Sequence, residues 1–311
     1  MSSFEPAYIG TFKKGLLKNK IAEANILLAS CVICPRKCDV DRHAGETGTC
    51  KTGEQSWVSS YSCHFGEEAP LVGSHGSGTI FFTHCNLLCL FCQNFDISHQ
   101  DNGQPVSGDD LAGIMLALQN QGCHNINFVT PSHVVPQILA AVEIGVQQGL
   151  SIPLVFNSGG YDRVATLKLL DGVFDIYMPD FKFWDSHVAE TTCRAPDYPH
   201  VARKAIIEMH RQVGDLQIDD TGIAQRGLII RHLVLPDGLA GTREIMRFIA
   251  QKVSPNSYVN VMSQYRPCGK AAEFKGFNSK LAPEDYKLAV QAAKEEGIIR
   301  LDRPYPRFLF R

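Results

Sequence analysis

Apolar residues recur along this chain in two patterns, short continuous runs and helically spaced sets, which alternate from residue 78 onward. The continuous runs predict six strands with little polar alternation. Their ranges are 79–82, 125–129, 152–156, 174–178, 228–235 and 258–262. Apolar strands separated by helices are typical of a parallel sheet covered by helices. The pattern therefore predicts an α/β fold, with a partial, TIM-like (β/α)6 barrel as its natural closure.

The helically spaced sets predict the helices that connect these strands. Ser107 can cap the first of them, and Gly149 follows the end of the second. A turn over 219–222, rich in Asp and Gly, predicts a hairpin before the fifth strand. The first expected helix begins at Ser107. The others cover 134–146, 198–213, 241–252 and 283–296.

The first 77 residues have a different character. An amphipathic helix is expected over 14–30, and the stretch 31–77 is rich in Cys, Gly, Ser, His and Glu with little apolar periodicity. Such a stretch suits organisation around a metal rather than around an apolar core. We expect residues 1–77 to form a helix and a metal-binding segment, and 78–311 to form the barrel with a final helix. The tail over 303–308 mixes aromatics and cations, which suits a strap over the barrel or a partner contact.

Composition and charge exclude several classes of protein. The chain of 311 residues is 44% hydrophobic and 20% charged, which is typical of a globular protein. Its 30 basic and 32 acidic residues leave a formal charge of -2, so no global field favours nucleic acid or an anionic membrane. The chain has neither a membrane-spanning run nor a secretory signal at its start, which predicts a cytoplasmic protein.

Eleven cysteines are unusual for a reducing compartment, where disulfides are not favoured. Seven of them form two groups, within 31–50 and 85–92. The other four stand apart and are expected to be small, inert core residues. These four are Cys63, Cys123, Cys193 and Cys268.

The second group, Cys85, Cys89 and Cys92, directly follows the first predicted strand. Spacings of four and three allow one loop to bind three irons of a cubane cluster, which leaves the fourth iron open for a ligand. The alternative is a structural zinc site that His84 or a distant residue completes. The position at the carboxyl end of a strand favours the cluster.

The motif Cys-x3-Cys-x-Phe-Cys at this place resembles that of the radical S-adenosylmethionine (SAM) superfamily. The resemblance implies a 4Fe-4S cluster on these three cysteines whose open iron chelates SAM. One-electron reduction, from a donor such as flavodoxin or ferredoxin, then releases a 5'-deoxyadenosyl radical that abstracts hydrogen. Phe91 would lie near the adenine.

Residues 31–270 resemble, more narrowly, the pyruvate formate-lyase activating enzymes and their uncharacterised relatives. Asp180 and Lys182 match an Asp-x-Lys motif that is associated there with SAM and a monovalent cation, and Arg231 matches an arginine on the SAM carboxylate. The alternative for Asp180 and Lys182 is a surface ion pair, and the alternative for Arg231 is a structural salt bridge. The resemblance implies cofactor contacts at Phe91, Thr130, Asn157, Ser158, Asp180, Lys182 and Arg231.

The first group consists of Cys31, Cys34, Cys38 and Cys50, with spacings of three, four and twelve. Four thiolates suit a closed zinc site, and they also suit an auxiliary iron-sulfur cluster that passes electrons to the first. The Cys-Pro-Arg-x-Cys stretch over 34–38 is similar to one that recurs in the activase-like family. Replacement ligands could come from His43, Cys63 or His64.

These features predict a radical SAM enzyme that abstracts hydrogen from a protein or peptide, with a glycyl-radical partner as one candidate. A small-molecule substrate is the second alternative. A non-enzymatic iron-sulfur or zinc protein, which transfers electrons or serves as a scaffold, is the third. No residue is assigned as a catalytic group from the sequence.

Overall fold

The computed structural model describes residues 4–302, so the tail over 303–308 lies outside the described residues. Its strands form one mixed sheet with the order β10-β9-β8-β6-β5-β4-β2-β1-β3, and β7 pairs with β8. The chain is therefore an α/β protein. The strands are β1 Ser56–His64, β2 Ser77–Phe82, β3 Gln104–Val106, β4 Ile126–Val129, β5 Leu154–Ser158, β6 Ile176–Pro179, β7 Gln217–Ile218, β8 Ala224–Leu233, β9 Tyr258–Met262 and β10 Arg300–Leu301.

The six predicted strands correspond to β2, β4, β5, β6, β8 and β9, which are parallel neighbours in chain order. Their apolar residues are buried, and Ile80, Phe128, Phe156 and Ile230 have no exposed surface. β8 begins four residues earlier than predicted, because its start pairs with β7 across the 219–222 turn. The predicted hairpin is therefore confirmed.

The strand β1 lies in the segment expected to have little regular structure. It is antiparallel to both β2 and β3, with Val58 opposite Phe82 and Trp57 opposite Pro105. Serines at 56, 59, 60 and 62 hide its apolar alternation in the sequence. Pairing with the buried strand β2 stabilises β1, and this long-range contact is invisible to a local pattern.

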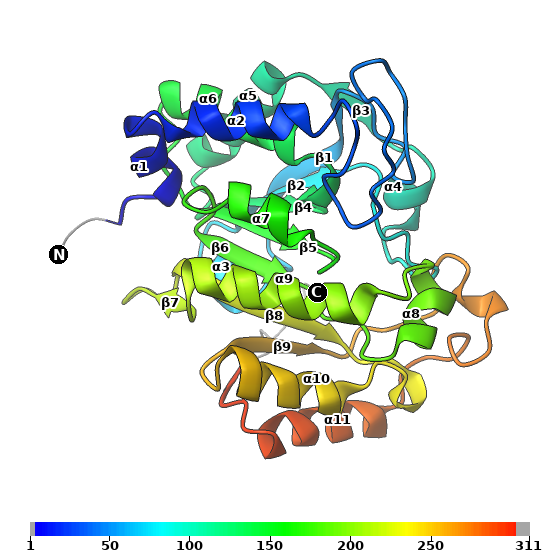
Figure 1. The fold of residues 1–311 in the computed structure, drawn as a ribbon. Coiled ribbons are helices and arrows are strands. Elements are labelled where there is room, and N and C mark those ends of the chain that lie inside the picture. The colour runs from blue at the N-terminus through cyan, green and yellow to red at the C-terminus, as the bar shows by residue number, and fades with distance from the viewer. Residues whose placement is uncertain (1–3, 303–311) are drawn as a thin grey trace, which may run out of the picture.

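The helices lie around the sheet, as Figure 1 shows: α2, α5 and α6 pack together at one end, α9 crosses the middle, and α10 and α11 lie at the other end. The predicted N-cap of α5 is confirmed as a capping box between Ser107 and Asp110. The helices are α1 Ala7–Lys13, α2 Leu16–Ile26, α3 Ala69–Val72, α4 Phe95–His99, α5 Gly108–Asn120, α6 Val135–Gln147, α7 Val164–Leu169, α8 Ser186–Cys193, α9 Tyr198–Val213, α10 Thr242–Phe248 and α11 Pro283–Glu295.

The helix expected over 14–30 is shorter than predicted. Gly15 adopts the left-handed conformation (φ 69°) and separates α1 from α2, which ends at Ile26. The stretch after α10 also departs from an α-helix, because residues 249–253 form a π-helical turn.

Within residues 4–302, no helix combines the length and the apolar character needed to cross a lipid bilayer.

Candidate functional site

A cavity of about 360 Å³ lies at the carboxyl ends of the parallel strands. Residues that directly follow β2, β4, β5 and β6 line it, because the carboxyl ends of parallel strands meet at one edge of a sheet. The structure brings together at this cavity every residue that the sequence implicated at the triplet and the SAM contacts. They are Cys85, Cys89, Phe91, Cys92, Thr130, Asn157, Ser158, Asp180, Lys182 and Arg231.

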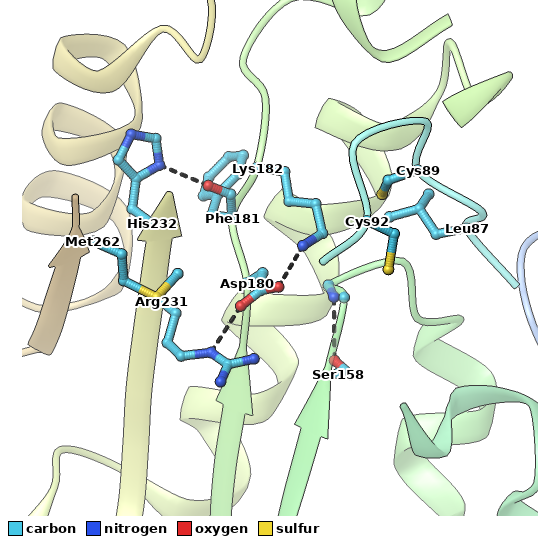
Figure 2. A network of polar contacts seen from close by, with 12 residues as sticks. Leu87, Cys89, Cys92, Ser158, Asp180, Phe181, Lys182, Arg231, His232 and Met262 are labelled. Carbon is cyan, nitrogen blue, oxygen red and sulfur yellow. Dashed lines mark hydrogen bonds and ion pairs between the residues drawn. The ribbon is translucent and has the colours of Figure 1, made fainter. Parts of the chain in front are cut away.

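Asp180 is the centre of a buried charge cluster, with Arg231 on one side and Lys182 on the other (Figure 2). Nε of Arg231 donates to Oδ1 of Asp180 at 2.8 Å, and Nζ of Lys182 donates to Oδ2. The three side chains are only 12–18% exposed. Burial opposes the charged carboxylate, but the two cations outweigh this effect and lower the pKa of Asp180. The cluster is therefore ionised and is no surface ion pair.

Tyr198, at the start of α9, holds the backbone around this cluster. Its hydroxyl accepts from the amide of Lys182 at 2.9 Å and lies 2.9–3.0 Å from the carbonyls of Gly159 and Asp180. The phenol thus joins the end of β5 to the end of β6. Sequence reasoning missed this role, because Tyr198 lies 16 residues beyond Lys182 and appears only as a helix-start residue.

A glycine turn lets the ends of β5 and β6 approach each other. Gly160 has a φ of +77°, and a Cβ built there would lie 2.1 Å from the carbonyl oxygen of Asp180. Gly149 shares the positive φ, at +97°, but a Cβ there would meet nothing within 4 Å. Of these two glycines, only Gly160 combines a positive φ with close packing.

We expect Gly160→Ala to lower the free energy of unfolding by about 1–3 kcal/mol more than Gly149→Ala does, since only the first overpacks its surroundings. Chemical denaturation of the two variants measures this difference. Equal losses in the two variants would show that the close approach to Asp180 is unimportant.

Asn157 and Ser158, at the end of β5, are already engaged by protein partners. Nη2 of Arg231 donates to the Asn157 side-chain oxygen at 2.6 Å. The Ser158 hydroxyl donates to Asp162 at 2.6 Å, and Ser132 donates to the other oxygen of the same carboxylate. Burial raises the pKa of Asp162 to about 6. Ser158 therefore belongs to a buried network that supports the cavity wall.

The loop that carries the triplet presents its sulfur atoms to internal donors. The Leu87 amide lies 3.3 Å from the Cys85 sulfur, and the Ser98 hydroxyl donates to the Cys92 sulfur at 3.3 Å. Burial raises the pKa of the Cys85 thiol to about 12. Such a thiol becomes a metal ligand when a binding cation displaces its proton, which is released to the solvent.

His84 is engaged away from the cavity. Its ring nitrogens lie 3.2 Å from the Thr52 hydroxyl and 3.0 Å from Asp101, and the side chain does not line the cavity. The structure therefore gives no support to a zinc site that His84 completes with the triplet.

Phe91 joins an aromatic cluster at the cavity wall. Its ring stacks on Phe277 at 5.8 Å and meets Phe183 and Tyr265 edge-on. Tyr265, which follows β9, packs against Phe91 and donates to the Phe277 carbonyl at 2.7 Å. Phe91 alone of these rings borders the cavity.

The cavity has an acidic side that sequence reasoning missed. His64, the last residue of β1, and Glu67 line it and are hydrogen-bonded to each other at 2.9 Å, while Nη1 of Arg231 lies 3.9 Å from Glu67. Burial raises the pKa of the adjacent Glu68 to about 7, and Asn260 donates to one of its oxygens at 2.9 Å. Only the pairing of β1 with β2 brings these residues to the site.

A second, smaller cavity of about 10 Å³ is lined by all four N-terminal cysteines. The predicted members Cys31, Cys34, Cys38 and Cys50 thus lie together. Gly48 packs so closely against Cys38 that a Cβ would lie 2.6 Å from its sulfur. This approach explains the glycine before Cys50.

One buried donor beside these cysteines supports a bound ligand there. Arg42 and His133 line the cavity, are about 1% exposed, and each keeps one nitrogen, Nη2 and Nδ1, without a partner among the described residues. Burial and the nearby Arg42 lower the pKa of His133 to about 3, so its ring is neutral, and Nδ1 is an acceptor because Nε2 donates to the Thr83 carbonyl at 3.1 Å. The unpaired Nη2 of Arg42 is a donor, which is costly to bury unless an acceptor completes it. A thiolate-bound metal centre would offer a sulfur acceptor to this nitrogen.

The suggested replacement ligands lie elsewhere. The His43 ring contacts Glu54 and the Asn25 carbonyl, and His64 belongs to the larger cavity. Cys63 lies 2.7 Å, sulfur to sulfur, from Cys123. Cys123 and Cys193 are buried, at 3% exposure each, which agrees with their expected place in the core.

Across residues 4–302, no group of three or more His, Cys, Asp or Glu side chains is arranged to hold a metal ion. A cubane cluster takes each thiolate on a different iron. The three thiolates therefore need not converge on one ion, and they border a cavity of about 360 Å³.

The fold and the site define an α/β protein with two cysteine-lined cavities, one of them at the carboxyl edge of its parallel strands. The chain is 33% identical over 294 residues to the Uncharacterized protein MJ0674 of Methanocaldococcus jannaschii, which covers 92% of this chain and 80% of that protein. The chain therefore belongs to the same family as this archaeal protein. No family model matches the sequence.

Proposed function

We propose that this protein is a radical SAM enzyme that abstracts hydrogen from a substrate. One observation carries the proposal: Cys85, Cys89 and Cys92 border the same cavity as the Asp180, Lys182 and Arg231 cluster. A 4Fe-4S cluster and SAM, when bound, would supply the electron transfer and the radical chemistry there. The three cysteines would hold the cluster.

The charged and aromatic residues of the cavity would orient SAM. Arg231 suits the SAM carboxylate because Asp180 and Asn157 take two of its nitrogens and leave Nη1 facing only the distant Glu67. Phe91 offers an apolar ring at the wall for the adenine. Thr130, at the end of β4, offers a hydroxyl for the SAM amino group.

The proposal extends to the closure of the sheet. Six parallel strands that neighbour each other in chain order are what a partial (β/α)6 barrel requires. The segment 1–77 would then be the metal-binding attachment to this barrel, with zinc or an iron-sulfur cluster on Cys31, Cys34, Cys38 and Cys50. A reducing, cytoplasmic location suits eleven free cysteines.

A monovalent cation has less support than the other cofactors. Lys182 and Arg231 already occupy both carboxylate oxygens of Asp180, and the Ser158 hydroxyl is bound to Asp162. We therefore leave this ion out of the proposal.

The test is 5'-deoxyadenosine formation by anaerobically reconstituted protein that receives SAM and dithionite. We expect the nucleoside by liquid chromatography and mass spectrometry, and a SAM-dependent change in the EPR spectrum of the reduced cluster. Absence of both would overturn the proposal. If a cluster is present but its EPR spectrum does not change when SAM is added, the result would instead favour the interpretation as an electron-transfer protein.

A further inference from the structure

Arg36, within the Cys-Pro-Arg-x-Cys stretch, binds backbone on two distant segments. Its guanidinium donates to the carbonyls of Asn86 at 2.9 Å and Leu87 at 3.3 Å, inside the triplet loop. It also donates to the carbonyls of Cys193 at 2.7 Å and Arg194 at 2.5 Å, at the end of α8.

These carbonyls surround the triplet. The segment 86–87 lies between Cys85 and Cys89, and the sulfur of Cys193 lies 3.2 Å from that of Cys89. The Leu90 amide donates to the Thr192 carbonyl at 2.9 Å, which joins the loop to α8 a second time. One side chain from the N-terminal segment thus holds both elements that shape the triplet.

The guanidinium also packs against an aromatic ring. It lies 5.3 Å from the centre of the Tyr161 ring, and the side-chain amide of Asn86 donates to the Tyr161 carbonyl at 2.8 Å. Tyr161 therefore contacts both Arg36 and the triplet loop.

The backbone around Arg36 is tightly bent. Lys37 and Asp39 adopt left-handed conformations, with φ of 43° and 54°, which are unfavourable for residues with a Cβ. Arg36 lies between Cys34 and Cys38, which line the four-cysteine cavity. Bonds from these two thiolates to one metal centre would hold this bend, since metal binding and local folding are coupled.

We propose that Arg36 is a positioning residue that makes retention of the cluster on Cys85, Cys89 and Cys92 depend on metal at the four-cysteine site. This inference rests on the proposed function, because it assumes an iron-sulfur cluster at the triplet. It holds for zinc and for iron at the N-terminal site, because Arg36 acts through its hydrogen bonds.

The experiment follows loss of triplet iron from the anaerobic full-length protein in the presence of an iron chelator. We expect Arg36→Gln to lose this iron at least about tenfold faster than the wild type, within the range of effects for outer-sphere partners of metal sites. Arg36→Lys keeps the charge without the planar fork and should lie between the two. While the four-cysteine site holds its metal, hydrogen exchange over residues 85–92 should be faster in Arg36→Gln than in the wild type.

Arg163→Gln is the matched control. Arg163, at the start of α7, donates to the Val32 carbonyl at 2.7 Å, so it also ties the N-terminal segment to the α/β part of the fold, but within residues 4–302 no hydrogen bond from it reaches the triplet loop. We expect wild-type iron retention from this variant. A thermal melt of each variant checks that it is folded.

A double-mutant cycle tests the coupling itself. Cys31→Ala should hasten loss of triplet iron about tenfold in the wild-type background and have little further effect beside Arg36→Gln. Wild-type retention by Arg36→Gln, or equal effects of Cys31→Ala in both backgrounds, would overturn the inference and leave the proposed function standing. If the anaerobic wild type and Cys85→Ala contain the same amount of iron, both the inference and the proposed function are overturned.

Discussion

Replacing Cys85 with alanine is expected to lower 5'-deoxyadenosine formation at least about 100-fold, the upper end of what loss of an outer-shell partner costs a metal site. The reason is that each thiolate would hold a different iron, so two cysteines cannot retain the cluster. The same loss is expected for Cys89→Ala and Cys92→Ala. Iron and sulfide counts on the anaerobic protein should fall in parallel.

Cys268→Ala provides the matched control for these variants. This cysteine is half-buried, follows β9, and does not border the larger cavity. Its loss should leave iron content and nucleoside formation at the wild-type level. If Cys85→Ala keeps wild-type iron content and wild-type nucleoside formation, the triplet does not hold the cluster.

Replacing Asp180 with alanine should lower the free energy of unfolding by about 3–5 kcal/mol, because it leaves two buried cations without their shared partner. Arg231 and Lys182 would then repel each other within a largely buried site. SAM binding should be lost as well, since both cations would change position. Denaturant unfolding and calorimetric titration with SAM measure the two effects.

The stability that Asp180 contributes has a defined pH dependence. Its folded-state pKa is lowered below the ordinary 3.8, so the contribution is fully present above that value. It is lost as the pH falls through the lower, folded-state pKa. The difference between wild type and Asp180→Asn should therefore shrink only in acid below about pH 4.

Glu295→Gln serves as the surface comparison. Glu295 pairs with Arg243, but both side chains are more than 40% exposed, so solvent screens the pair. No measurable loss of stability is expected from this variant. A loss from Asp180→Ala as small as that from Glu295→Gln would show that the Asp180 cluster behaves as a surface pair.

Local patterns predicted the parts of the fold that depend on neighbouring residues. The apolar runs located the parallel strands, and Ser107 marked the start of α5, because burial and capping act within a few residues. The helix over 14–30 was wrong at both ends, since Gly15 breaks it and the chain turns after Ile26.

Contacts between distant residues account for what local patterns missed. β1 is stabilised by β2, and this pairing brings His64 and Glu67 to the cavity. Tyr198 reaches the Asp180 cluster from the start of a helix. Nη1 of Arg36 donates to the carbonyl of Arg194, which lies 158 residues further along the chain. No periodicity in one sequence encodes such pairings.

The sequence by itself identified the residues on which the proposed chemistry depends, since the two cysteine groups stand out by spacing and the Asp-x-Lys pair by its resemblance to a known motif. It also located the six parallel strands of the α/β sheet, because each carries its own apolar run. Only the tertiary structure decided that the triplet and the Asp-x-Lys pair share one cavity and that Asp180 lies buried between two cations. The physical reason is that burial and charge pairing depend on distances between strand ends, which folding sets and local sequence does not.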